Sequence, residues 1–232
     1  MFYFNPTYLL FMAPAFLLML LTSWYVKAAY NKWSRVPANS RMTGAQAAQR
    51  LISAGGLYGV EIERVGGQLS DHYDPRSKTL RLSRGVADSP SVAAVAVAAH
   101  ELGHAMQDAE EYLPLRFRAA LVPAVNIGST LGWILIMVGL FLNWVNVAWL
   151  GVLVFSGGAL FALATLPVEF NASARAKRLL AETGIIQTEE ERRGVNSVLN
   201  AAALTYVASL VTAILQLLYY VSLVGGLGRS RD

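Results

Sequence analysis

The chain has 232 residues, of which 55% are hydrophobic and only 15% are charged. A typical soluble domain carries about 25% charged residues, so this composition excludes a disordered chain and an ordinary soluble protein. No cysteine is present, which excludes disulfides, thiolate metal sites and a cysteine nucleophile. The formal net charge of +4 comes without a long run of Lys and Arg, so we expect no nucleic-acid partner.

Three long stretches contain no Lys, Arg, Asp or Glu: residues 1–26, 119–168 and 194–228. Because about 20 apolar helical residues cross a bilayer, the first stretch predicts an N-terminal transmembrane anchor over 1–26, with its helix from about Tyr8 to Val26. A signal peptide is the alternative. Against it, the positive charges follow the apolar run instead of preceding it, and no small-residue cleavage site is evident.

The second stretch is 50 residues long, too long for one crossing, and polar and aromatic residues interrupt it near its middle. It predicts a transmembrane hairpin over 119–168, with arms from about Leu121 to Leu142 and from about Val147 to Leu166. The third stretch predicts a C-terminal transmembrane helix, about Ala202 to Val224, which together with a short tail makes up residues 201–232. We therefore expect four crossings.

The basic residues are concentrated in two polar segments between these spans. Of 19 Lys and Arg, 12 lie from Lys27 to Arg118 and five from Arg175 to Arg193. The positive-inside rule places polar segments 27–118 and 169–200 in the cytoplasm and both termini outside.

The first half of segment 27–118 predicts a small α+β unit. Thr43 is an N-cap candidate for an amphipathic helix that stops at Gly55. Apolar residues alternate over 60–65, 69–73 and 79–83, which predicts two or three short antiparallel strands. We expect a mostly α membrane fold, with four transmembrane helices and this small cytoplasmic α+β unit.

A further helix is predicted from Ser89, with Pro90 at its first position, to about Gln107. It carries His100, Glu101 and His104 as an H-E-x-x-H motif. Residues four apart lie on the same helix face, so both imidazoles can bind one Zn²⁺ at about 2.0–2.1 Å. Glu101 is then placed to take a proton from a zinc-bound water, whose pKa the metal lowers to about 7.

A chance match to this short motif is the alternative. However, the motif holds two of only three histidines in the chain, and a charged Glu101 on a helix of Ala and Val is costly unless it is used. We therefore predict a metal site with Glu101 as catalytic residue. Gly103, inside the motif, either lets a neighbouring backbone come close or is simply tolerated.

A catalytic zinc usually has three protein ligands and one open position. Glu169 is the best-placed third candidate, because it is the first charge after the 50-residue stretch and follows Pro167, where we expect a helix to restart. The alternative for Glu169 is an interfacial acid paired with Arg175 or Lys177. His72 is the other candidate ligand, although we expect it on a strand.

The polar residues around His72 allow two further interpretations. Either His72 or Tyr73 can hydrogen-bond the oxyanion of a tetrahedral intermediate, and an ordinary structural turn is the alternative. An edge strand at 78–83 or 69–73 can hold a peptide substrate as an added strand, and plain sheet packing is equally compatible with the pattern.

Three segments together resemble the YugP-type neutral zinc metallopeptidases of bacterial membranes: HELGHAMQ, the upstream LSDHYDPRSKTLRLS and the downstream LPVEFNASARAKRLL. More distantly, the order of elements resembles the gluzincin core of the HtpX and CAAX prenyl-protease group. The resemblance implies a zincin-like catalytic unit in which His100, His104 and Glu169 bind Zn²⁺ and Glu101 is the catalytic base.

The chain departs from the wider group at one position. That group commonly has an Asp four residues after the ligand Glu, whereas this chain has Ser173. Support for a metal-bound histidine is therefore expected from Asn171, Ser173 or another residue.

We expect a multi-pass zinc metalloendopeptidase of the bacterial inner membrane, with its site facing the cytoplasm. Its partners would be the lipid bilayer and a peptide or membrane-protein substrate. The sequence is also compatible with a regulatory membrane partner or with a homo-oligomer. The alternative is a zinc-binding membrane scaffold, or a partner-gated protease with little activity alone, although a site without activity has no need of Glu101. A metal transporter is disfavoured because the predicted spans contain no ionisable residue.

Overall fold

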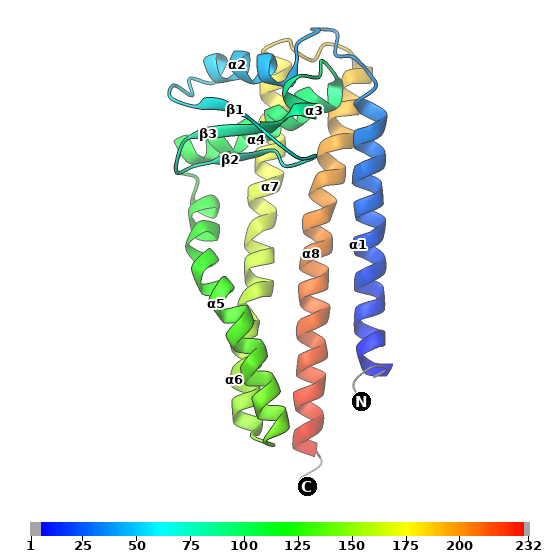
Figure 1. The fold of residues 1–232 in the computed structure, drawn as a ribbon, viewed down its shortest axis with the longest axis vertical. Helices are drawn as coiled ribbons and strands as arrows, with labels where there is room; N and C mark the ends of the chain where they lie inside the picture. The colour runs from blue at the N-terminus through cyan, green and yellow to red at the C-terminus, as the bar shows by residue number, and fades with distance from the viewer. Residues whose placement is uncertain (1–5, 230–232) are drawn as a thin grey trace. The chain divides into compact units, whose positions relative to one another are not determined.

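The computed structural model describes residues 6–229, and Figure 1 shows its helices and strands. In chain order they are α1 (Pro6–Trp33), α2 (Gly44–Ala54), β1 (Glu61–Val65), β2 (His72–Asp74), β3 (Thr79–Ser83), α3 (Arg84–Ala87), α4 (Val92–Ala109), α5 (Leu113–Phe141), α6 (Val145–Phe155), α7 (Gly157–Glu182) and α8 (Glu189–Arg229). Residues 1–5 of the predicted anchor and 230–232 of the predicted tail lie outside the described residues.

The chain divides into two compact units. The unit we call the apolar unit comprises the described parts of Met1–Thr22, Arg116–Pro167 and Thr205–Asp232, and the polar unit comprises Ser23–Leu115 and Val168–Leu204. The boundaries fall within the long helices, so each of these helices contributes residues to both units.

Four helical stretches among the described residues are long and apolar enough to cross a membrane: Pro6–Trp33, Leu113–Phe141, Val145–Glu182 and Glu189–Gly226. The predicted fold class, a mostly α membrane protein with a small α+β unit, is confirmed. Each stretch is longer than the span predicted from the charge gaps, because the helix continues beyond the apolar residues into polar sequence.

Within the apolar unit, α5 and α6 form the predicted hairpin, and their backbones touch at glycines. A Cβ atom on Gly139 would lie 2.7 Å from the Cα of Ala148, and one on Gly132 would lie 2.9 Å from the carbonyl oxygen of Gly151. Small residues at such contacts allow helices to pack closely where lipid offers no hydrophobic driving force.

The second arm of the hairpin differs from the prediction in two places. The helix is interrupted at Ser156, the C-cap of α6, so the predicted single helix is divided between α6 and α7. Pro167 then lies inside α7, and the predicted restart after Pro167 is wrong. Proline removes one backbone donor without ending a helix when the neighbouring turns are held, as is common in membrane helices.

The polar unit contains a three-stranded sheet in the order β1-β3-β2. The β2–β3 pair is antiparallel, as predicted, but β1 pairs with β3 in parallel, so the expectation of an all-antiparallel sheet is wrong. Alternation identifies a strand without fixing the direction of its partner. The central β3 buries Leu80 and Leu82 completely, and β1 and β2 are the edges.

The helix α4 supplies many of the buried residues of this unit's core and contacts β2 and β3, which lie in front of it in Figure 1. It begins at Val92 with Ser91 as N-cap, two residues later than the predicted start at Pro90. The delay arises because the preceding residues pair with another segment: the carbonyl of Pro90 accepts from the amide of Ala38 at 2.9 Å. The amphipathic helix α2 begins after Thr43, whose side chain completes a capping box with Gln46.

Candidate metal centre

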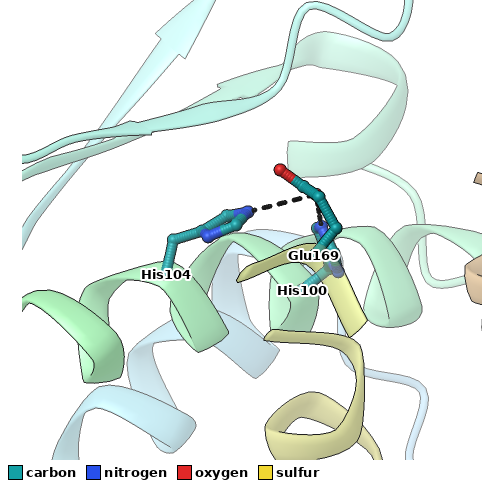
Figure 2. Close-up of side chains that lie close together, drawn as sticks. All are labelled: His100, His104 and Glu169. Atoms are coloured by element: carbon teal, nitrogen blue, oxygen red, sulfur yellow. Dashed lines mark ion pairs between the residues drawn. The ribbon is translucent and has the colours of Figure 1, made fainter. Parts of the chain in front are cut away.

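Three side chains from α4 and α7 converge in the polar unit (Figure 2). One potential ligand atom from each of His100, His104 and Glu169 lies within 4.8 Å of the others. The Oε2 atom of Glu169 is 3.4 Å from Nε2 of His100 and 3.6 Å from Nε2 of His104. The two ligand candidates of the motif and the best-placed third candidate are therefore brought together.

The spacing of these atoms fits a zinc ion. The separations of 3.4 and 3.6 Å exceed the usual N–H···O length of about 2.7–3.2 Å. Two ligands on one tetrahedral Zn²⁺ are about 1.6 times the metal–ligand distance apart, roughly 3.3 Å. Moreover, Glu169 is only 2% exposed, and a buried carboxylate needs a positive partner. This donor set and spacing suit a single zinc ion.

A close backbone contact between α4 and α7 positions Glu169 beside the histidines. Gly103 lies against Ala172, and a Cβ atom at Gly103 would overlap the carbonyl oxygen of Ala172 and come within 3.0 Å of its Cα. Ala172 is three residues after Glu169, so the contact holds the turn of α7 that carries the carboxylate. Of the two interpretations of Gly103, close approach of a backbone is therefore correct.

Each imidazole is also held from its other nitrogen. The Nδ1 atom of His104 lies 3.0 Å from Oε1 of Gln107, and Nδ1 of His100 lies 3.2 Å from the hydroxyl of Ser173. With a proton on Nδ1, each ring presents the lone pair of Nε2 toward Glu169, which is the arrangement that metal-bound histidines require.

Of the two residues predicted to support a histidine, one contacts a histidine directly and the other contacts it through Gln107. Ser173 contacts His100, whereas Asn171 contacts Gln107, because Nε2 of Gln107 donates to Oδ1 of Asn171 at 3.0 Å. Gln107 was not identified from the sequence. Its signal was available in the motif, since it follows His104 by three residues and so lies on the same helix face.

Glu101 follows His100 on α4. Burial raises the pKa of the Glu101 carboxyl; the charges of the two histidines oppose this shift, while Glu169 and Asp71 add to it. Asp71 itself is anchored, because Oδ1 accepts from the amide of Ser83 at 2.7 Å. A raised pKa brings a carboxylate closer to the range in which it accepts and returns a proton near neutral pH.

The residues 72 and 73 lie on the edge strand β2. His72 is exposed and its Nδ1 lies 2.8 Å from the carbonyl oxygen of Ser70, and it is not part of the three-residue cluster. The hydroxyl of Tyr73 donates to Oδ2 of Asp108 at 2.9 Å. Burial is the main cause that raises the pKa of Tyr73, and the hydrogen bond to Asp108 raises it further. Asp108 is one helical turn after His104, so Tyr73 connects the edge strand to the face of α4 that carries the two histidines.

The alternative partners of Glu169 have other contacts. Arg175 donates to Oε1 of Glu110 at 2.6 Å, and Lys177 donates to Oδ1 of Asn200 at 3.1 Å. The interpretation of Glu169 as an interfacial acid for these two cations is therefore less well supported than its place beside the histidines.

Comparison with known proteins relates the chain to one family. The family model described as "Putative neutral zinc metallopeptidase" matches residues 8–225. A curated relative, "Putative membrane protease YugP" of Bacillus subtilis (strain 168), is 45% identical over 196 residues, which are 84% of this chain and 87% of the relative. No solved structure matches the chain.

Proposed function

Since this chain belongs to the neutral zinc metallopeptidase family, we propose that it is a membrane-embedded zinc endopeptidase that hydrolyses membrane or membrane-proximal proteins. The observation that carries the proposal is the placement of Oε2 of Glu169 at 3.4 and 3.6 Å from the two histidine Nε2 atoms. Four apolar helices favour membrane substrates, because such a substrate would share the bilayer with the enzyme.

His100, His104 and Glu169 would hold the ion in a gluzincin-like arrangement. When bound there, zinc supplies a Lewis acid that polarises the scissile carbonyl and makes a water molecule more acidic. Three protein ligands leave a position open for substrate or water.

Glu101 is the residue proposed to move the proton. It would accept a proton from the attacking water as the carbonyl carbon is attacked, and it would return that proton to the amine nitrogen as the peptide bond breaks. Its raised pKa supports both steps, because a carboxylate of ordinary pKa returns a proton to an amine less readily.

The edge strand β2 is the proposed binding site for the peptide backbone. Because β3 is central, the expectation that residues 78–83 form the edge is wrong, and residues 72–74 remain. A peptide added to β2 would run beside the metal-binding face of α4, to which Tyr73 is hydrogen-bonded through Asp108. His72 and Tyr73 would then contact substrate or the developing oxyanion.

We also propose a bacterial inner-membrane location with the site in the cytoplasm. The support is the distribution of charge: 12 of the 19 basic residues lie from Lys27 to Arg118, and the hairpin turn around Asn143 has none.

The test is proteolysis by the full-length protein reconstituted in bilayer nanodiscs. The wild type and Glu101→Gln would be incubated with a panel of unfolded and membrane-anchored substrates, with zinc content measured on the same samples. Glu101→Gln is expected to retain one zinc per chain and to lose roughly 10²- to 10⁴-fold in cleavage rate, which is the usual contribution of a general base.

The control is Glu63→Gln, a carboxylate on the edge strand β1 that pairs with Arg81 and has no place in the proposed chemistry. Equal cleavage by the wild type and Glu101→Gln would reject the assignment of the base. A wild type that binds zinc but cuts nothing in the panel would favour the scaffold or the partner-gated protease instead.

A further inference from the structure

A continuous line of polar contacts runs from His104 to an exposed ion pair. Oε1 of Gln107 lies 3.0 Å from Nδ1 of His104, and Nε2 of Gln107 donates to Oδ1 of Asn171 at 3.0 Å. The same Oδ1 accepts from Nε of Arg175 at 2.6 Å, and Arg175 donates to Oε1 of Glu110 at 2.6 Å. The line leaves α4 at Gln107, continues along α7 through Asn171 and Arg175, and returns to Glu110 at the C-cap of α4.

Each amide in this line can occupy its place in two orientations, because the oxygen and nitrogen of Asn and Gln have nearly the same shape. For Gln107 the orientation matters to the metal site. With Oε1 toward His104, the ring must donate from Nδ1 and keeps the lone pair of Nε2 for a metal. With the amide reversed, its NH₂ group would favour a lone pair on Nδ1 and a proton on Nε2, which blocks coordination.

Two acceptors hold the Gln107 amide in the productive orientation. Its Nε2 donates to the carbonyl oxygen of Val168 at 2.8 Å and to Oδ1 of Asn171. Gln107 is completely buried, so no solvent replaces a lost partner. The carbonyl of Val168 can only accept, but Asn171 could also turn its own NH₂ group toward Gln107.

Arg175 prevents this reversal of Asn171. A guanidinium has donors only, so the group of Asn171 that faces it must be the oxygen. The arginine is itself fixed, because it pairs with Glu110 and its guanidinium carbon lies 5.8 Å from the centre of the Tyr112 ring. Arg175 therefore fixes the orientation of Asn171, which is one of the two acceptors that hold the Gln107 amide.

The ring form of His100 is not fixed by a comparable set of hydrogen bonds. Nδ1 of His100 faces the hydroxyl of Ser173, and a hydroxyl can donate or accept, so it selects neither form of the ring. The two ligands thus differ in how firmly their protonated nitrogen is defined, and this difference supplies an internal control.

We propose that Arg175 is a positioning residue that raises the zinc affinity of the site by fixing the Asn171 and Gln107 amides and hence the ring form of His104. The inference rests on the metal site of the proposed function. It concerns residues of this chain that lie outside the ligand set and that touch no substrate in the proposed chemistry.

The first measurement is zinc affinity, obtained by competition with a chromophoric chelator on the full-length protein in nanodiscs. Loss of a side chain that supports a metal-bound histidine typically weakens binding by about 10- to 100-fold. We expect a loss of that size for Gln107→Met and a loss of about tenfold or less for Arg175→Met. Arg178→Met is the matched control, since Arg178 is an exposed arginine on the same helix.

The second measurement is the ¹H–¹⁵N spectrum of the zinc-loaded protein labelled at histidine, which has only three such residues to assign. In Arg175→Met, the Nδ1 proton of His104 should move upfield and exchange faster, while that of His100 stays unchanged. In Ser173→Ala the pattern should reverse. A merely structural role for Arg175 would move both resonances together.

A rescue variant tests the orientation itself. Asp has two acceptor oxygens and no NH₂ group to turn, so Asn171→Asp in the Arg175→Met background should restore the His104 resonance. If Arg175→Met does not fold, Arg175→Lys serves in its place, because a lysine cannot donate to Asn171 and Glu110 in the same fork geometry.

The proposal is overturned if Arg175→Met and Arg175→Lys leave both the zinc affinity and the His104 resonance at wild-type values. It is also overturned if both histidine resonances change equally or if the rescue variant restores nothing. A wild type that binds no zinc would instead reject the proposed metal site, so the two failures are distinguishable.

Discussion

Gly103 lies so close to Ala172 that no side chain fits between them, since a Cβ atom on Gly103 would come within 3.0 Å of the Ala172 Cα. The contact joins the helix that carries both histidines to the helix that carries Glu169. A metal site assembled from two helices needs them at a fixed separation, because each ligand must reach the ion within a few tenths of an ångström. The glycine inside the motif therefore sets the separation of the two helices on which the proposed metal site depends.

We predict that Gly103→Ala weakens both the fold and the site. The added methyl group must push α7 away from α4, and forcing atoms into a packed core typically destabilises a protein by about 1–3 kcal/mol. The displaced Glu169 should lower the zinc affinity as well. Denaturant unfolding and chelator competition would measure the two effects.

The matched control is Gly158→Ala, the same change in α7 at a position where a Cβ atom would meet nothing within 4 Å. It should leave zinc binding unchanged. Wild-type zinc affinity in Gly103→Ala would contradict the role of this contact.

A second prediction concerns the third ligand. Glu169→Ala should lose most of its zinc on dialysis, because two imidazoles alone lack the charge and the third donor of a catalytic site. His72→Ala should retain one zinc per chain, since His72 is exposed and lies outside the three-residue cluster. Elemental analysis of the two purified variants beside the wild type gives the answer, and the opposite pattern would make His72 the ligand.

A third prediction follows from the titration of His104 in the metal-free protein. Burial lowers the pKa of His104, but hydrogen bonding to Glu169 and the charge of Glu101 raise it by more, so the net direction is upward. Zinc binds only the neutral ring and must displace the proton. The apparent zinc affinity should therefore fall as pH decreases through this raised pKa, beginning above the ordinary imidazole value of about 6.5.

Chelator competition from pH 6 to 9, with calorimetry in buffers of different ionisation enthalpy, would measure both the affinity and the protons released. Glu101→Gln removes one of the charges that raise the pKa of His104, so the onset should move to lower pH in that variant. A zinc affinity that does not change across this range would contradict the prediction.

The parts of this fold that follow from local pattern were predictable from the sequence. The charge gaps predicted four apolar helices, and the spacing of His100 and His104 predicted that both imidazoles share one helix face, because both signals lie within a single helix. The capping box at Thr43 is equally local, and the structure contains it.

The errors arose where distant segments meet. Alternation could not show that β1 pairs in parallel with β3, and the pairing that holds Pro90 extended involves residues more than 50 positions earlier in the chain. The spacing of Gln107 three residues after His104 was visible in the sequence, but its contacts with a carbonyl and an amide on another helix were not. Such contacts are decided by tertiary packing, which one sequence does not display.

A final prediction separates two roles for Tyr73. Its hydroxyl donates to Asp108, and its pKa is raised, so it stays protonated and able to donate through neutral and alkaline pH. Tyr73→Phe removes that bond, at a net cost of about 1 kcal/mol in stability, and should leave zinc binding intact. If Tyr73 only anchors the edge strand, the variant should raise KM for a peptide substrate and change kcat little.

If the hydroxyl instead turns toward the oxyanion, kcat should fall by about 10²- to 10³-fold with little change in KM, as when one oxyanion donor is removed. Asp108→Asn distinguishes the two cases further, because it keeps an acceptor for the tyrosine and so should preserve the anchor. Unchanged kcat and KM in Tyr73→Phe would exclude both roles.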